Sequence, residues 1–165
     1  MPKIIILRGN SGSGKTTAGR ALQRKFGMGT MLISQDVVRR EMIFVRDRPG
    51  NKAIDLLKTL VMFAYENCEV AILEGILYAE QYQILFDFAL ELYGENIFAY
   101  YFDLTFEETL KRHLSKANAN EFGETEMRRW WHDRDYLPYI KEKMLGADMS
   151  TEDVVERICA DIALI

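Results

Sequence analysis

Short apolar runs alternate with longer stretches of helical periodicity along most of the chain. The runs are rich in β-branched and aromatic residues and predict strands at 3–7, 30–33, 70–73 and 97–102. Apolar positions three and four residues apart predict helices at 17–26, 52–67, 80–93, 106–114 and 152–163. Strands that are almost wholly apolar are typical of a parallel sheet with helices on both faces. The alternation therefore predicts a three-layer α/β/α fold.

Weaker signals add detail to this picture. Residues 143–145 are a candidate fifth strand, so we expect a parallel sheet of four or five strands. Thr105 and Glu108 predict a capping box at the start of helix 106–114, and Ser150 or Thr151 is expected to cap the last helix. The polar segment 115–123 breaks the helical period and predicts a surface loop. Since no linker-like composition interrupts the pattern, residues 1–165 are expected to form a single domain.

Composition narrows the class of protein. With 48% hydrophobic and 28% charged residues, the chain has the make-up of a soluble globular protein. The net charge of −4 argues against nucleic acid as the main partner, because a phosphate-backbone binder usually carries a basic surplus. Cys68 and Cys159 lie in apolar helical patterns and are expected to be core residues in a reducing compartment. No apolar run is long enough to cross a membrane, so we expect a cytoplasmic protein. It is expected to be a monomer or a homodimer.

The segment after the first predicted strand matches a nucleotide-binding motif at every fixed position. The pattern G-x-x-x-x-G-K-[ST] is filled by Gly9, Asn10, Ser11, Gly12, Ser13, Gly14, Lys15 and Thr16, with Thr17 opening the next helix. In such a loop, backbone N–H groups and the helix N-terminus surround phosphate oxygens. Lys15 is expected to reach the β- and γ-phosphates, and the Thr16 hydroxyl to ligate Mg²⁺. The chain is therefore expected to bind a nucleoside triphosphate, either ATP or GTP.

Acidic residues follow two further strands. Asp36 comes just after the second predicted strand, and Arg39 lies one helical turn later. Because ligands sit at the carboxyl ends of strands in open α/β sheets, Asp36 is expected to face the phosphate loop. There it would act as a base toward an acceptor hydroxyl, with Arg39 holding the acceptor; alternatively, it caps a helix. Glu74 ends the third strand, where it either helps to hold Mg²⁺ or stands in solvent.

Basic residues gather between positions 112 and 134. They are Arg112, Lys116, Arg128, Arg129 and Arg134. In phosphoryl-transfer enzymes, mobile arginines close over the phosphates and offset charge in the transition state. Each residue alone is better explained by a solvated helix face, but the group as a whole favours a lid. His113 and His132 have no partners at metal-ligand spacing and are expected to have surface or core roles. Trp130, Trp131 and Tyr136 are expected to pack in the core, with the alternative that one of them lines the acceptor pocket.

Taken together, these motifs resemble the small P-loop kinases of the nucleoside-monophosphate-kinase-like group. The chain looks like the branch of gluconate and shikimate kinases, chloramphenicol phosphotransferase, polynucleotide 5′-kinase and zeta toxins, and like uncharacterised bacterial kinases. The resemblance implies a P-loop nucleoside triphosphate hydrolase fold in which Asp36 is the catalytic base and Arg39 binds the acceptor. It also implies a lid over about residues 112–134. There Arg112 would stack on adenine, and Arg128 or Arg129 would close over the transferring phosphate.

The expected activity is the Mg²⁺-dependent transfer of the ATP γ-phosphoryl group to a hydroxyl of a small molecule. Three alternatives stay open: a polynucleotide 5′-hydroxyl kinase, a zeta-toxin-like nucleotide-sugar kinase, and a non-catalytic nucleotide sensor. The chain lacks the acceptor signatures of shikimate and gluconate kinases, so the sequence does not name the acceptor.

Overall fold

A parallel sheet forms the centre of the protein. The computed structural model describes residues 1–117 and 119–163, and within them five strands form one sheet in the order β2-β3-β1-β4-β5, with every neighbouring pair parallel. The strands are β1 (Lys3–Gly9), β2 (Met31–Ser34), β3 (Val70–Gly75), β4 (Ile97–Phe102) and β5 (Glu142–Leu145). The candidate fifth strand is therefore real and pairs with β4.

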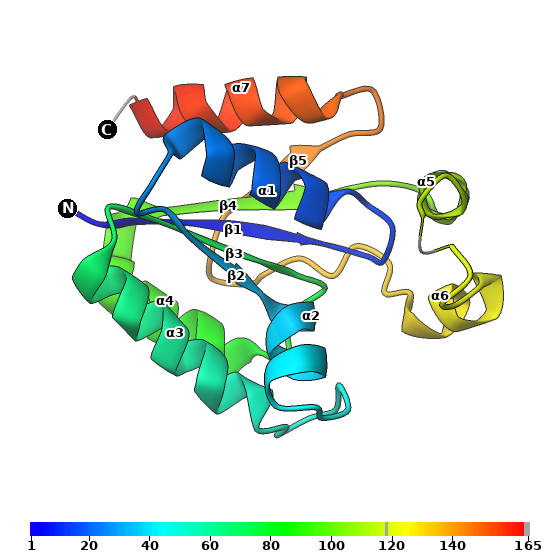
Figure 1. The fold of residues 1–165 in the computed structure, drawn as a ribbon, viewed down its shortest axis with the longest axis horizontal. Helices are drawn as coiled ribbons and strands as arrows, with labels where there is room; N and C mark the ends of the chain where they lie inside the picture. The colour runs from blue at the N-terminus through cyan, green and yellow to red at the C-terminus, as the bar shows by residue number, and fades with distance from the viewer. Residues whose placement is uncertain (118, 164–165) are drawn as a thin grey trace.

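Helices cover both faces of the sheet, as Figure 1 shows. On one face lie α1 (Lys15–Phe26) and α7 (Thr151–Ala163), and on the other α3 (Ala53–Asn67) and α4 (Gln83–Tyr93). Shorter elements surround the carboxyl ends of the strands or link longer ones. They are α2 (Gln35–Val37), the π-helical turn η1 (Val38–Met42), the 3₁₀ turn η2 (Gly94–Asn96), α5 (Phe106–Leu114) and α6 (Glu124–Trp130). The predicted three-layer α/β/α fold is confirmed.

The core is split into two clusters by the alternation of side chains along β1. Ile4 and Ile6 pack into the cluster shared with α3 and α4, whereas Ile5 and Leu7 pack into the cluster shared with α1 and α7. All four side chains are fully buried. Successive strand residues point to opposite faces, so a strand covered on both sides must be apolar throughout. This explains why β1 reads as a continuous apolar run.

Helix boundaries follow the capping groups. The Thr105 hydroxyl accepts a hydrogen bond from the Glu108 N–H at 3.2 Å, but the Glu108 carboxylate pairs with Arg112 instead of returning to the cap. Only half of the predicted capping box is therefore formed. Ser150 is the cap of α7, because its hydroxyl accepts from the Asp153 N–H and the Asp153 carboxylate accepts from the Ser150 N–H.

The predicted polar loop holds its place between α5 and α6. Described residues 115–117 and 119–123 contain turns and bends and neither helix nor strand; Asn118, inside the predicted lid, lies outside the described residues. Cys68 and Cys159 are free thiols of intermediate burial, each packed against one core cluster. Within the described ranges, no helix combines the length and the apolar character that a membrane crossing requires.

Candidate functional site

The phosphate loop joins the end of β1 to the start of α1. Gly12 and Gly14 have φ angles of 79° and 102°, in the left-handed region that favours glycine. A Cβ atom at Gly12 would lie 2.6 Å from the carbonyl oxygen of Thr109, so the loop packs directly against α5. Gly14 is therefore required by its backbone conformation, and Gly12 is required both by its conformation and by the lack of space for a side chain.

Lys15 folds back over the loop. Its Nζ donates to the carbonyl oxygen of Asn10 at 2.8 Å and lies 3.3 Å from the Ser13 hydroxyl. The side chain is nearly buried, and this burial lowers the pKa of Lys15 to about 8, although the nearby Glu74 carboxylate opposes the shift. The lysine thus holds a positive charge in a site where water is largely excluded, which is the setting in which it attracts phosphate most strongly.

Thr16 and Glu74 meet at the base of the site. The Thr16 hydroxyl lies 3.2 Å from both carboxylate oxygens of Glu74, and Glu74 is almost completely buried. Hydroxyl and carboxylate oxygens are hard ligands of the kind that Mg²⁺ prefers, so this pair fits a magnesium ion that also contacts nucleotide phosphates. Among residues 1–117 and 119–163, no group of three or more His, Cys, Asp or Glu side chains is placed to hold a metal by itself.

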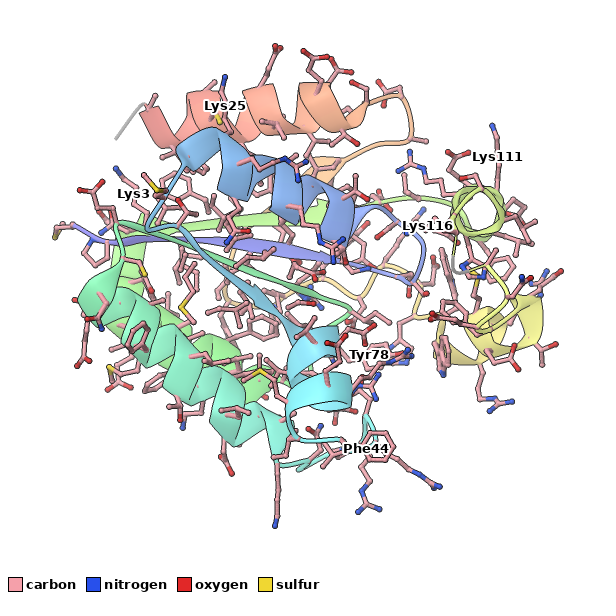
Figure 2. The ribbon with its side chains drawn as sticks, in the orientation of Figure 1. Lys3, Lys25, Phe44, Tyr78, Lys111 and Lys116 are labelled. Atoms are coloured by element: carbon pink, nitrogen blue, oxygen red, sulfur yellow. The ribbon has the colours of Figure 1, made fainter. Side chains whose placement is uncertain are left out.

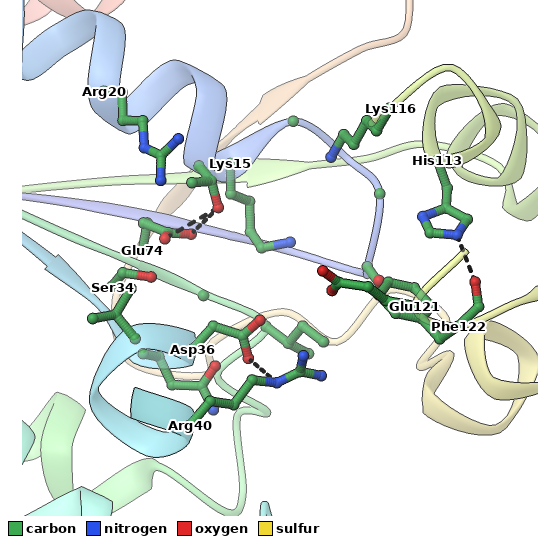
Figure 3. Close-up of a pocket in the computed structure, with 18 of the residues that line it drawn as sticks. Lys15, Arg20, Ser34, Asp36, Arg40, Glu74, His113, Lys116, Glu121 and Phe122 are labelled. Carbon is green, nitrogen blue, oxygen red and sulfur yellow. Dashed lines mark hydrogen bonds and ion pairs between the residues drawn. The ribbon is translucent and has the colours of Figure 1, made fainter. Parts of the chain in front are cut away.

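A cavity of about 340 Å³ opens above this pair and is shown in Figure 3. Ser11, Gly12, Gly14, Lys15 and Thr16 of the loop line it together with Asp36 and Glu74, so the structure brings these predicted site residues into one space. We call it the loop cavity. It has the size of a small-molecule site.

Arg20 and Arg40, which were not among the predicted site residues, also line the loop cavity, together with Lys116 of the predicted lid. Figure 3 shows Arg20 extending from α1 toward Glu74, and Lys116 reaching back over the phosphate loop. Burial lowers the pKa of Lys116, with Glu74 opposing the shift and Arg112 adding to it. These residues reach the cavity from different elements, and periodicity gives no signal for such an arrangement.

Asp36 and Arg39 lie together, as their spacing predicted. Asp36 Oδ1 is 3.1 Å from an Arg39 guanidinium nitrogen and 3.5 Å from Arg40 Nε, and the Asp36 side chain is 57% exposed. A second cavity, of about 240 Å³, adjoins the loop cavity here and shares Ser11, Asp36 and Arg40 with it. We call it the side cavity. Asp36 therefore stands where two spaces meet, beside the phosphate loop.

Arg112 lies against the phosphate loop. One guanidinium nitrogen donates to the carbonyl oxygen of Ser13 at 3.0 Å, another to that of Ala147 at 3.3 Å, and Nε pairs with Glu108 at 2.9 Å. The arginine thus bridges the loop and the segment after β5. Its position beside the loop is compatible with the stacking on adenine that the resemblance implies, and that role stays a prediction.

The structure does not bring the other predicted arginines to the site. Arg128 pairs with Glu124 on the same helix at 2.7 Å and lies over the Phe106 ring at 4.1 Å. Neither Arg128 nor Arg129 is among the described residues that line the loop cavity or the side cavity. Thr17 also stays outside the loop cavity, exposed on α1. In this conformation, Arg112 and Lys116 are the basic residues of the predicted lid that approach the phosphate loop.

The two histidines of the lid stack on aromatic rings, and His113 also lines the loop cavity. His113 is buried, stacks on the Phe122 ring at 4.3 Å, and has Nε2 2.8 Å from the Phe122 carbonyl oxygen. His132 stacks on the Tyr78 ring at 3.9 Å. The expectation of core or surface roles agrees with this placement.

Asn10 has a second function beyond the loop backbone. Its side-chain amide donates to the carbonyl oxygen of His132 at 2.8 Å and accepts from the His132 N–H at 2.9 Å. The segment that follows α6 is thereby tied to the phosphate loop. Sequence reasoning missed this contact, because the two residues are 122 positions apart.

Arg8 was also missed. It is fully buried in β1 and pairs with Asp135 and Glu142, each at 2.8 Å, while its Nε donates to the carbonyl oxygen of Leu77. Its one signal in the sequence is a charged residue between Leu7 and Gly9, at the end of an otherwise apolar strand. Charged residues are rarely fully buried unless they are paired, so that position marks a buried ion pair.

Comparisons with known proteins agree with this geometry. The AAA domain family model matches residues 4–130. A gluconokinase from Sinorhizobium meliloti 1021 superposes with a TM-score of 0.69 at 13% identity, over 99% of this chain and 93% of the other. The Mycobacterium tuberculosis APS kinase, in complex with AMPPNP and APS, gives 0.68 at 19% identity over 99% and 98%. A shikimate kinase from Acinetobacter baumannii, in complex with shikimate, gives 0.62 at 19% identity over 99% and 94%.

At these identities the likeness shows the fold, and the predicted P-loop nucleoside triphosphate hydrolase fold is confirmed. No curated protein matched the chain.

Proposed function

The chain belongs to the AAA domain family. We propose that it is a kinase that moves the γ-phosphoryl group of ATP to a hydroxyl of a small molecule. The observation that carries the proposal is the position of Asp36. It lies on the border of the loop cavity, which holds Lys15, and of the side cavity, which has room for an acceptor. Solved structures of the same fold are named as gluconokinase, APS kinase and shikimate kinase, which supports a kinase acting on a small molecule.

The donor side is built from the phosphate loop. Backbone N–H groups of the loop and the N-terminus of α1 bind the β- and γ-phosphates, and Lys15 adds a positive charge. Thr16 and Glu74 would hold Mg²⁺, which when bound offsets the negative charge of the phosphates. Arg112 and Lys116 lie nearest to this region from the predicted lid. Arg128 or Arg129 would reach the phosphates only after movement of α6.

On the acceptor side, Asp36 takes the proton of the acceptor hydroxyl as the hydroxyl oxygen attacks the γ-phosphorus. A new oxygen–phosphorus bond forms, the bond from the γ-phosphorus to the β–γ bridging oxygen breaks, and ADP leaves with that electron pair. The proton then passes from Asp36 to solvent, for which its half-exposed position is suited. Arg39 and Arg40 hold the carboxylate in place.

We further propose that residues 1–165 act as one kinase domain in the cytoplasm, since both cavities are built on a single sheet and both cysteines are free thiols.

Substitution of Asp36 tests this function. A screen of ADP release over polyols, sugars, nucleosides and hydroxy acids identifies an acceptor, and product is then measured by mass spectrometry. Asp36→Asn is expected to lower kcat by 100-fold or more with little change in ATP binding, since a general base contributes about 10²–10⁴-fold. Lys15→Ala is expected to weaken ATP binding as well. If Asp36→Asn turns over the acceptor within a few-fold of the natural protein, the assigned base is wrong.

A further inference from the structure

The side cavity has a basic wall. It is lined by Ser11, Asp36, Arg39, Arg40, Arg46, Asp47, Ile76, Tyr78, Phe122 and Trp130. Three arginines face two carboxylates, which leaves one positive charge in excess around about 240 Å³ of space. A volume of this size admits a compact metabolite.

Arg39 has an unused hydrogen-bond donor in this wall. Its terminal nitrogens are engaged, one with the carbonyl oxygen of Val45 at 3.2 Å and one with Asp36 at 3.1 Å. Its Nε is buried and, within the described residues, is the one buried side-chain nitrogen or oxygen that lacks a hydrogen-bond partner. Buried polar groups are nearly always paired, so the Arg39 guanidinium carries one N–H that no described residue satisfies.

Arg46 supplies the excess charge. Within residues 1–117 and 119–163, no carboxylate lies within ion-pair distance of its guanidinium. The neighbouring Asp47 is occupied elsewhere: it accepts from the Tyr82 hydroxyl at 2.6 Å, from Gln81, and from Gln35 at 3.3 Å. Its charge is therefore held by a separate polar network and does not neutralise Arg46.

The remainder of the side cavity is aromatic and held in place. The Tyr78 hydroxyl donates to the carbonyl oxygen of Trp130 at 2.7 Å, and the Tyr78 ring stacks on His132. Trp130 in turn packs edge-on against Phe122, with ring centroids 5.0 Å apart. Figure 2 shows Tyr78 on the side of α2 that faces α6. Such a wall suits the carbon skeleton of a compact ligand.

We propose that the side cavity selects an acceptor that carries an anionic group, a carboxylate or a phosphate, close to its reacting hydroxyl. Arg46 binds the anion, the Arg39 guanidinium adds its positive charge, Tyr78 and Trp130 contact the carbon skeleton, and the hydroxyl points to Asp36 and Ser11, where the two cavities meet. Guanidinium groups are the side chains best matched to carboxylate and phosphate oxygens. This proposal rests on the proposed kinase function and leaves its phosphoryl-transfer step unchanged.

Matched acceptor pairs test the selection. Each pair presents the same hydroxyl with and without the anion: gluconate and glucitol, glycerol 3-phosphate and glycerol, adenosine 3′-monophosphate and adenosine. For the pair that contains the better acceptor, kcat/KM is expected to be at least 100-fold higher for the anionic member. Arg46→Gln and Arg39→Gln are expected to reduce that ratio by tenfold or more. Arg48→Gln, an exposed arginine in the same loop that does not line the side cavity, is the matched control and is expected to keep it.

Anion binding is measured separately, so that the two proposals fail in different ways. With Mg²⁺ and AMPPNP filling the phosphate loop, calorimetric titration with inorganic sulfate is expected to show one saturable site. That site is expected to weaken at least tenfold in Arg46→Gln and to persist in Arg48→Gln.

Absence of the sulfate site, or equal turnover of neutral and anionic acceptors, would overturn the proposal that the side cavity selects an anionic acceptor. Neither result would contradict the proposed kinase function. A sulfate site without any phosphorylated product across the pairs would instead count against the kinase function. Preferential phosphorylation of a 5′-hydroxyl oligonucleotide over adenosine 3′-monophosphate would overturn the choice of a small molecule.

Discussion

At the scale of single residues, the site depends on a charge that the fold holds away from water. Lys15 is 7% exposed, and its side chain bonds to the carbonyl oxygen of Asn10. Burial disfavours the charged form, which is why the pKa of Lys15 falls from 10.5 to about 8. The negative charge of a bound polyphosphate would favour the charged form of Lys15 and so raise its pKa again. The loop therefore carries a stability cost in the free protein that nucleotide binding relieves.

Lys15→Met is expected to make the free protein more stable at neutral pH. Between pH 8 and 10.5 the unfolded chain binds more protons at this residue than the folded protein does, so the free energy of unfolding rises with pH there. Below pH 8 the full cost of the buried charge is present. Urea unfolding at pH 7 should show Lys15→Met more stable by about 1–3 kcal/mol, and the gain should shrink toward pH 10.

Lys25→Met is the matched control, since Lys25 is an exposed lysine at the other end of α1. It should change stability by less than about 1 kcal/mol. Equal effects of the two substitutions, or a gain for Lys15→Met that does not change with pH, would contradict the assigned cost.

At the scale of elements, the sequence predicts those parts whose structure is decided locally. Strands β1 to β4, the long helices and the phosphate loop follow from periodicity and from a contiguous motif, and they lie where the sequence placed them within a few residues. The positions of Asp36 and Glu74 follow from the rule that strand ends carry the site. The segment between α6 and β5 is different. It has no periodic pattern, and contacts with distant residues such as Asn10 fix its course.

Asn10→Ala is expected to release that segment. The two hydrogen bonds between the Asn10 side chain and the His132 backbone are partly buried, so their loss should lower the free energy of unfolding by about 1–3 kcal/mol. Hydrogen exchange at the His132 amide should accelerate more than exchange in β1. Asn67→Ala provides the comparison, because the Asn67 amide donates a single exposed bond to the carbonyl oxygen of Phe63. Unchanged exchange at His132 in Asn10→Ala would show that other contacts hold the segment.

At the scale of the whole molecule, Arg8 joins parts of the chain that no local pattern connects. Its guanidinium contacts the loop after β3, the segment after α6 and the start of β5, at sequence separations of 69, 127 and 134 residues. Its guanidinium carbon lies 5.4 Å from the centroid of the Phe86 ring and 5.6 Å from that of the Tyr101 ring. The sequence shows a charge in an apolar strand but cannot show its partners, since these depend on which strands become neighbours. The same limit hid Arg20 from the predicted site.

Arg8→Met tests whether this ion-pair cluster holds the molecule together. Glu142 is 1% exposed at its side chain, so removal of the arginine leaves a buried carboxylate without its charge partner. Loss of one member of a buried pair costs about 3–5 kcal/mol, and urea unfolding should show a decrease of that size. Arg157→Met, which removes an exposed arginine from α7, should cost less than about 1 kcal/mol.

The double substitution Arg8→Met and Glu142→Gln separates charge from packing. If the cost comes from the unpaired carboxylate, the neutral amide should recover at least half of the lost stability, and it keeps an oxygen that can accept the bond Glu142 now receives from the Leu137 N–H at 2.8 Å. If instead the cost comes from lost contacts of the guanidinium with Phe86 and Tyr101, the double variant should be no more stable than Arg8→Met. Recovery would mean that Arg8 is needed chiefly to compensate the buried Glu142 carboxylate, and that packing and backbone pairing hold β5 and the segment after α6 to β1 even without the ion pair.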